Sequence, residues 1–131
     1  VEAVLEATDA PWYAGAGDIG AVTVSRPDNE VGDGDRVFDL QIIESPGHTP
    51  GHICVLDQAA GILVAGDALN GGPDGVRGPD ERFTEDMELA NASVVKLAGF
   101  DYEVALFGHG EPVVEEASAR VDELAGSLAS G

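Results

Sequence analysis

Apolar and polar residues alternate along this chain with two different periods. They alternate one by one over 37–43, and two further apolar runs, 52–57 and 61–66, are joined by only a few residues. Short apolar runs bounded by turn residues predict strands, and so short a connection predicts an antiparallel hairpin. We therefore expect a three-stranded meander over 37–66, followed later by a buried strand at 104–107.

Two segments have the longer period of amphipathic helices. Thr84 is expected to cap a helix that ends near Gly99, because acidic residues occupy its first turn and apolar residues recur behind them. Residues 113–128 have apolar positions at helical spacing, and Pro112 before them suits a first helical turn. The chain thus combines a mostly antiparallel sheet with helices, which is an α+β fold class.

The other segments are short or lack a period. Residues 1–7 predict the end of an amphipathic helix with no capping residue before it, so we expect an N-terminally incomplete single domain over 1–131. Residues 11–14 predict a short strand. The acidic, glycine-rich stretch that follows them, up to residue 29, predicts a loop with at most one short helix. Gly, Pro and Asp dominate 70–80, which predicts an exposed loop.

Composition is that of one folded domain. The chain has 131 residues, of which 44% are hydrophobic, so it can bury a modest core. The longest apolar runs have the length of strands, so we expect neither a signal peptide nor a membrane span. Cys54 is the single cysteine and lies in an apolar run, which predicts a buried structural thiol and excludes an internal disulfide.

Charge excludes several classes of partner. The formal net charge is −19, from 25 acidic and 6 basic residues. Such a surface repels nucleic acids and anionic membranes. The acidic residues are spread along segments that still have strand and helix patterns, which favours a folded acidic protein over a disordered one. Abundant acid with scarce lysine is typical of halophilic, haloarchaeal-type proteins, so we expect a salt-adapted cytoplasmic protein.

Four polar residues stand where a metal site would need them. His48, His52 and His109 each follow a glycine, and Asp67 follows a glycine at the end of an apolar strand. Loops at strand ends are where rigid sheets present functional groups. Imidazoles and a carboxylate suit zinc, and also manganese or ferrous iron. From the residues alone, a metal site and solvated loop histidines both remain open.

The order of three motifs favours the metal site. SPGHTPGH at 45–52, GILVAGDAL at 61–69 and FGHG at 107–110 together resemble the metallo-β-lactamase superfamily, especially its glyoxalase II-like branch. The resemblance implies that His48 ligates a first metal, that Asp67 bridges two metals at the catalytic centre, and that His109 ligates the second. It places His52 outside the ligand set, where it would orient a ligand or support the loop.

The resemblance also implies a fold and an activity. The family fold is an αββα sandwich, of which this chain would supply one sheet with helices on one face. The family reaction is hydrolysis of ester, thioester or lactone-type small molecules by a water that two metals, typically zinc, activate. The family's upstream H-x-H-x-D-H motif does not occur in this sequence, so each ion would receive only two ligands from this chain.

Three functional hypotheses follow. The first is a metal-dependent hydrolase whose N-terminal half is absent here or is supplied by another chain. The second is a non-catalytic remnant or interaction domain that forms a homodimer through an exposed sheet face. The third is an acidic domain whose loop histidines are simply solvated. Arg77 and Arg82, in or beside the loop at 70–80, are candidates for contacting an anionic substrate.

Overall fold

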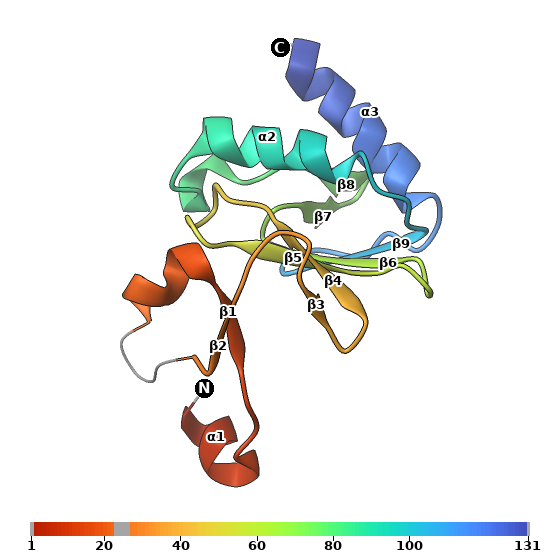
Figure 1. Cartoon of the computed structure of the whole chain (residues 1–131). Helices are drawn as coiled ribbons and strands as arrows, with labels where there is room; N and C mark the ends of the chain where they lie inside the picture. The colour runs from red at the N-terminus through yellow and green to blue at the C-terminus, as the bar shows by residue number, and fades with distance from the viewer. Residues whose placement is uncertain (1, 23–26, 131) are drawn as a thin grey trace.

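A five-stranded sheet with two helices packed on one face forms the centre of the fold (Figure 1). The structure is a computed structural model that describes residues 2–22 and 27–130. In chain order the elements are α1 (Glu2–Thr8), β1 (Tyr13–Gly15), the 3-10 helix η1 (Ala16–Ala21), β2 (Asn29–Val31), β3 (Arg36–Val37), β4 (Leu40–Glu44), β5 (Ile53–Asp57), β6 (Ile62–Gly66), β7 (Asn70–Gly72), β8 (Gly75–Arg77), the 3-10 helix η2 (Glu81–Phe83), α2 (Met87–Leu97), β9 (Val104–Phe107) and α3 (Ala117–Ser130).

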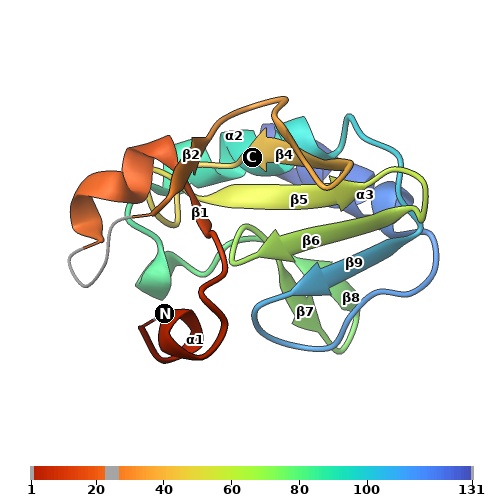
Figure 2. The ribbon, with the colours of Figure 1, turned by 60° about the horizontal axis from the view of Figure 1, so that its bottom comes forward.

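The central sheet has the strand order β3-β4-β5-β6-β9. Strands β3 to β6 are antiparallel neighbours, and β9 joins the edge of β6 in parallel. Figure 2 shows β4, β5, β6 and β9 side by side. Because β4 and β6 run the same way and β9 follows β6, the carboxyl ends of these three strands meet at one edge of the sheet. The predicted α+β class, with a mostly antiparallel sheet and helices on one face, is confirmed.

The core lies between the sheet and the helices α2 and α3. Alternate strand residues point toward the helices, as the period of two requires. Burial of this apolar surface is the main favourable contribution to folding. The fully buried members of the cluster are Ile43, Cys54, Leu56, Leu63, Ala65, Leu69 and Ala105 from the sheet and its adjoining turn, with Val94, Leu97, Ala117 and Val121 from the helices. The prediction of a buried Cys54 is confirmed.

The opposite face of the sheet is apolar and partly open. Val64 on β6 pairs with Val55 on β5 and with Leu106 on β9, so these side chains form a row across three strands. Val64 is 45% exposed and Leu106 is 38% exposed. Large apolar side chains exposed in one row are typical of a face that another element covers.

The predicted strand at 37–43 is wrong as a single element. Phe38 and Asp39 have φ of 52° and 65°, and they turn the chain between β3 and β4. Positive φ at both central residues is the sign pattern of a type I′ hairpin turn, which suits the twist of the flanking strands. Phe38 is 85% exposed, so the apolar residue that continued the alternation stands at the tip of a turn.

The predicted exposed loop at 70–80 is also wrong, because most of it is a hairpin. Strands β7 and β8 pair antiparallel, with Asn70 opposite Arg77 and Gly71 opposite Val76. Val76 packs against the core, and several residues of the hairpin are half-buried. Backbone pairing forms this hairpin without an apolar period, which is why the sequence pattern missed it.

Both predicted helices exist, but their starts differ. Asp86, not Thr84, caps α2, since its carboxylate accepts the Leu89 N–H at 3.0 Å. The last helix starts at Ala117, not at 113. Val113 instead forms an antiparallel bridge with Ala105, which extends the pairing beyond β9.

The remaining local predictions are mostly confirmed. Helix α1 and strand β1 agree with the expected elements at 1–7 and 11–14, apart from Val1, which lies outside the described residues. η1 is the one short helix expected before residue 29, and the part of that loop at 23–26 also lies outside the described residues. The hairpin of β5 and β6 and the strand β9 are present as predicted. Within the described residues, no helix combines the length and apolar character needed to cross a membrane.

Salt is expected to stabilise this fold. In the described part of the chain, only Arg82 with Asp80 and Lys96 with Asp33 pair a basic side chain with one of the many acids. Repulsion among the unpaired carboxylates therefore opposes the compact state at a net charge of −19. The Debye length falls from ~30 Å at 0.01 M salt to ~3 Å at 1 M. We expect the thermal unfolding midpoint to rise steadily over this range, and a midpoint independent of NaCl would contradict this.

Candidate metal centre

Three predicted site residues meet at the edge where β4, β6 and β9 end. His48 lies in the loop after β4, Asp67 directly follows β6, and His109 closely follows β9. Each side chain is thus carried by a different strand of one rigid sheet. The backbone fixes the last two together, since the Gly108 N–H donates to the Gly66 carbonyl at 2.8 Å.

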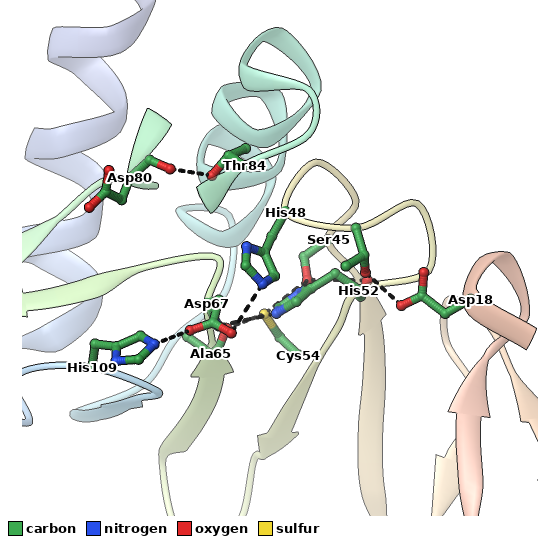
Figure 3. A network of polar contacts seen from close by, with 11 residues as sticks. Asp18, Ser45, His48, His52, Cys54, Ala65, Asp67, Asp80, Thr84 and His109 are labelled. Carbon is green, nitrogen blue, oxygen red and sulfur yellow. Dashed lines mark hydrogen bonds and ion pairs between the residues drawn. The ribbon is translucent and has the colours of Figure 1, made fainter. Parts of the chain in front are cut away.

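The Asp67 carboxylate lies between the two histidines (Figure 3). His48 Nε2 is 3.3 Å from Oδ2, and His109 Nε2 is 3.3 Å from Oδ1. Although His109 is this close, its geometry does not make a hydrogen bond, and Oδ1 is buried with no hydrogen-bond partner. A buried carboxylate oxygen without a donor costs free energy unless a cation meets it.

This donor set fits divalent cations. His48 is 26% exposed and Asp67 33%, whereas His109 is 80% exposed at the rim. Two imidazoles facing separate oxygens of one carboxylate suit a pair of ions that share the carboxylate. Among the described residues, no three His, Cys, Asp or Glu side chains are grouped to hold one ion.

His52 lies behind this group and not in it. Its ring is 5.8 Å from the His48 ring, edge to face, and its Nε2 accepts the Asp67 backbone N–H at 3.1 Å. Burial, followed by the neighbouring His48, lowers the pKa of His52 below its ordinary value, against the opposing effects of Asp67 and Asp18. His52 therefore contacts the backbone of a candidate ligand, as a residue outside the ligand set would.

Asp18 holds the loop that carries His48. Its carboxylate accepts the Thr49 hydroxyl at 2.6 Å and the Gly51 N–H at 2.7 Å, which ties η1 to residues 49–51. Hydrogen bonds to a charged acceptor are about twice as strong as neutral ones. Sequence analysis missed Asp18, because it lies in a stretch without a period and its partners are far away along the chain.

Replacing Asp18 with Asn should loosen this loop. An amide can accept only one of the two donors well, because its NH₂ group would face the other. We expect the free energy of unfolding to fall by about 1–3 kcal/mol in denaturant titrations. Asp57→Asn is the matched control, since Asp57 accepts one exposed N–H at the other end of β5. Equal losses in both variants would contradict the role given to Asp18.

A cavity of about 270 Å³ opens above the candidate metal ligands. Arg82 lines it but is bound to Asp80 by a 2.7 Å ion pair and lies over the Phe83 ring, so its charge is already paired. Arg77 does not line the cavity. The full lining consists of His48, Asp67, Asn70, Asp80, Arg82, Phe83, Thr84 and His109. Apart from the two histidines, Asp67 and Arg82, these lining residues carried no recognisable functional signal in the sequence.

Comparison with known proteins identifies the family of this chain. The family model described as the metallo-beta-lactamase superfamily matches residues 2–109. The chain belongs to this superfamily. A protein from Bacillus subtilis (strain 168) named "Probable metallo-hydrolase YflN" is 38% identical over 100 residues, which are 67% of this chain and 38% of the relative. The chain therefore spans well under half the length of that relative.

Solved structures share the fold. The metallo-beta-lactamase family protein TTHA1429 from Thermus thermophilus is 26% identical with a TM-score of 0.61, over 81% of this chain and 36% of that one. TTHA1623, solved in a di-iron-bound form, is 23% identical with a TM-score of 0.70, over 92% of this chain and 68% of that one. Metal dependence is typical of the superfamily, and the metal described for TTHA1623 is iron.

Proposed function

We propose that this chain supplies half of a two-metal hydrolytic centre of the glyoxalase II-like branch. One observation carries the proposal: each oxygen of the Asp67 carboxylate faces Nε2 of a different histidine, and Oδ1 is buried without a hydrogen bond. His48 with Oδ2 would hold one ion, and His109 with Oδ1 the other. Zinc is the proposed metal, with manganese or iron as alternatives.

The residues of this chain would bind the divalent ions and orient them beside the cavity. When bound, divalent ions supply Lewis acidity and lower the pKa of a water molecule toward neutrality. The Asp67 carboxylate would contribute one oxygen to each ion, and its backbone directly follows strand β6 of the sheet, which holds the side chain in place. The cavity beside it has room for a small ester, thioester or lactone. Arg82 and Asp80 offset each other's charge in its lining, which leaves the Asp67 carboxylate as the remaining formal negative charge there.

Each ion would need further ligands besides His48, Asp67 and His109. We propose that a complementing segment with the H-x-H-x-D-H motif covers the open sheet face and completes both ions. The partial coverage of YflN and TTHA1429 supports this, as does the exposed row of Val64 and Leu106. A salt-adapted cytoplasmic setting is part of the same proposal, on the ground of the −19 charge.

Zinc titration in high salt tests the proposal. Calorimetry with the wild-type chain should give up to two ions, and His48→Ala and His109→Ala should each remove one of them. Hydrolysis of ester, thioester and lactone substrates would then be assayed with the zinc-loaded chain, alone and with a separately expressed segment containing H-x-H-x-D-H. Absence of binding, or binding unchanged in a His48→Ala, His109→Ala double variant, would contradict the proposal.

A second candidate function is a non-catalytic interaction domain that forms a homodimer. The exposed apolar row on β6 and β9 favours it, because such a face gains stability when a second copy covers it. Light scattering in high salt should then give twice the monomer mass, and Val64→Glu should return the chain to a monomer. A monomeric wild-type chain would rule this candidate out.

A further inference from the structure

The His52 ring lies between a backbone N–H, which can only donate a hydrogen bond, and a serine hydroxyl, which can donate or accept one. On one side is the Asp67 backbone N–H, 3.1 Å from Nε2. A peptide N–H can only donate, so Nε2 must accept and cannot carry a proton. The neutral ring then holds its proton on Nδ1. On the other side Nδ1 lies 2.8 Å from Ser45 Oγ, which can accept this N–H.

Two buried side chains, Ser45 and Cys54, extend this series of hydrogen bonds. Ser45 is 1% exposed, and its hydroxyl, having accepted from His52, can donate to Cys54 Sγ at 3.1 Å. The Cys54 S–H in turn donates to the Ala65 carbonyl at 3.5 Å. A carbonyl can only accept. Backbone groups with fixed roles therefore stand at both ends of the chain of contacts, and donation from His52 through Ser45 and Cys54 to Ala65 satisfies every member (Figure 3). The Ser45 hydroxyl also lies 3.5 Å from the His52 carbonyl, a second acceptor for the same proton.

We infer that Ser45 and His52 are positioning residues that hold the Asp67 backbone, and with it the shared carboxylate, by fixing the Nδ1–H tautomer of His52. The opposite tautomer would set Nε2–H against the Asp67 N–H, two donors face to face. Asp67 would then have to move at the point where β6 ends. The contacts start and finish within residues 65–67, so they brace the turn that carries the carboxylate.

The backbone at Gly66 is shaped for this contact. Its φ is 54°, and a β-carbon there would lie 2.9 Å from His52 Nε2. A side chain at 66 would thus press on the ring nitrogen that accepts the Asp67 N–H. Glycine gives the left-handed turn and the space together. The register between β6 and β9 also shifts between Val64 and Gly66, where the strand departs from regular pairing.

The tautomer itself is measurable without metal. In the nitrogen-15-labelled, metal-free full chain, long-range proton–nitrogen NMR spectra should show His52 with a protonated Nδ1 and an unprotonated Nε2. The consequence for metal binding rests on the proposed function, whereas this measurement does not. A predominant Nε2–H tautomer in the wild-type chain would overturn the inference even if zinc binds.

A matched pair of serine variants separates positioning from general stability. Ser45→Ala removes the acceptor of Nδ1–H, whereas Ser93→Ala removes another buried serine whose hydroxyl donates to the Pro46 carbonyl at 2.7 Å. We expect Ser45→Ala to mix the His52 tautomers and to speed hydrogen exchange of the Asp67 amide by about two- to tenfold. Ser93→Ala should change neither. Identical changes in both variants would overturn the inference.

Two replacements of His52 give the rescue test. Glutamine can place its amide oxygen near the Nε2 position and accept the Asp67 N–H, whereas asparagine is too short to do so. Asp67 amide exchange should stay within about twofold of wild type in His52→Gln and rise about two- to tenfold in His52→Asn. Zinc affinity should follow the same order. If Asp67 amide exchange differs between His52→Gln and His52→Asn but neither variant nor the wild type binds zinc, the proposed function fails and the positioning role stands. Equal exchange in the two variants overturns the positioning role.

Discussion

Asp67→Asn is expected to abolish binding of both divalent ions, whereas His48→Ala removes only one. Each carboxylate oxygen faces a different histidine, so one side chain serves two sites. An amide has a single oxygen, carries no charge and turns an NH₂ donor toward one of the ions. Loss of an outer-sphere partner lowers metal affinity by about 10–100-fold, and loss of a shared ligand should exceed about 100-fold. Calorimetric zinc titration in high salt measures both stoichiometry and affinity.

The matched control for this variant is Asp57→Asn. Asp57 also ends a strand of the same sheet, but it accepts only the Ala60 N–H in a turn at the opposite end of β5. The substitution removes the same charge from the protein, so any general electrostatic effect on zinc affinity appears in both variants. One ion still bound to Asp67→Asn with unchanged affinity would mean that the carboxylate does not bridge.

The candidate ligands were predictable because their signals are local. His48, Asp67 and His109 each stand next to a glycine at the end of an apolar run, and a sheet brings such ends together. Asp18 had no such signal, since its partners Thr49 and Gly51 are more than thirty positions away in the sequence. Its role depends on how η1 packs on the loop, which no periodicity encodes.

The same distinction explains the errors in the fold. Strands β5, β6 and β9 have buried faces and were found from their apolar runs. The turn at Phe38 and Asp39 places Phe38, a bulky residue that rarely takes positive φ, at its first central position, so the alternating pattern continues through it unbroken. The hairpin of β7 and β8 pairs through its backbone with few apolar side chains. Backbone hydrogen bonds do not depend on side-chain type, so the pattern of hydrophobic residues does not predict this hairpin.

Gly47→Ala should be among the most damaging single changes outside the core. Gly47 has a φ of 139°, and a β-carbon there would overlap the backbone of Ala90 on α2. The Gly47 carbonyl also accepts the N–H of Asp86, the residue that caps this helix. Backbone strain of ~1–3 kcal/mol adds to a similar cost of overpacking. We expect the free energy of unfolding to fall by about 2–5 kcal/mol, measured by denaturant titration in high salt.

Gly78→Ala distinguishes this effect from a general cost of replacing glycine. Nothing lies within 4 Å of a β-carbon at Gly78, and its φ is not in the left-handed region. That variant should change stability by less than about 1 kcal/mol, because alanine only restricts the unfolded chain more. A Gly47→Ala variant as stable as Gly78→Ala would mean that the loop can move away from α2. His48 would then not be held at a fixed place beside Asp67. The distance between these two candidate ligands would depend on the position of the loop and not on its packing against α2.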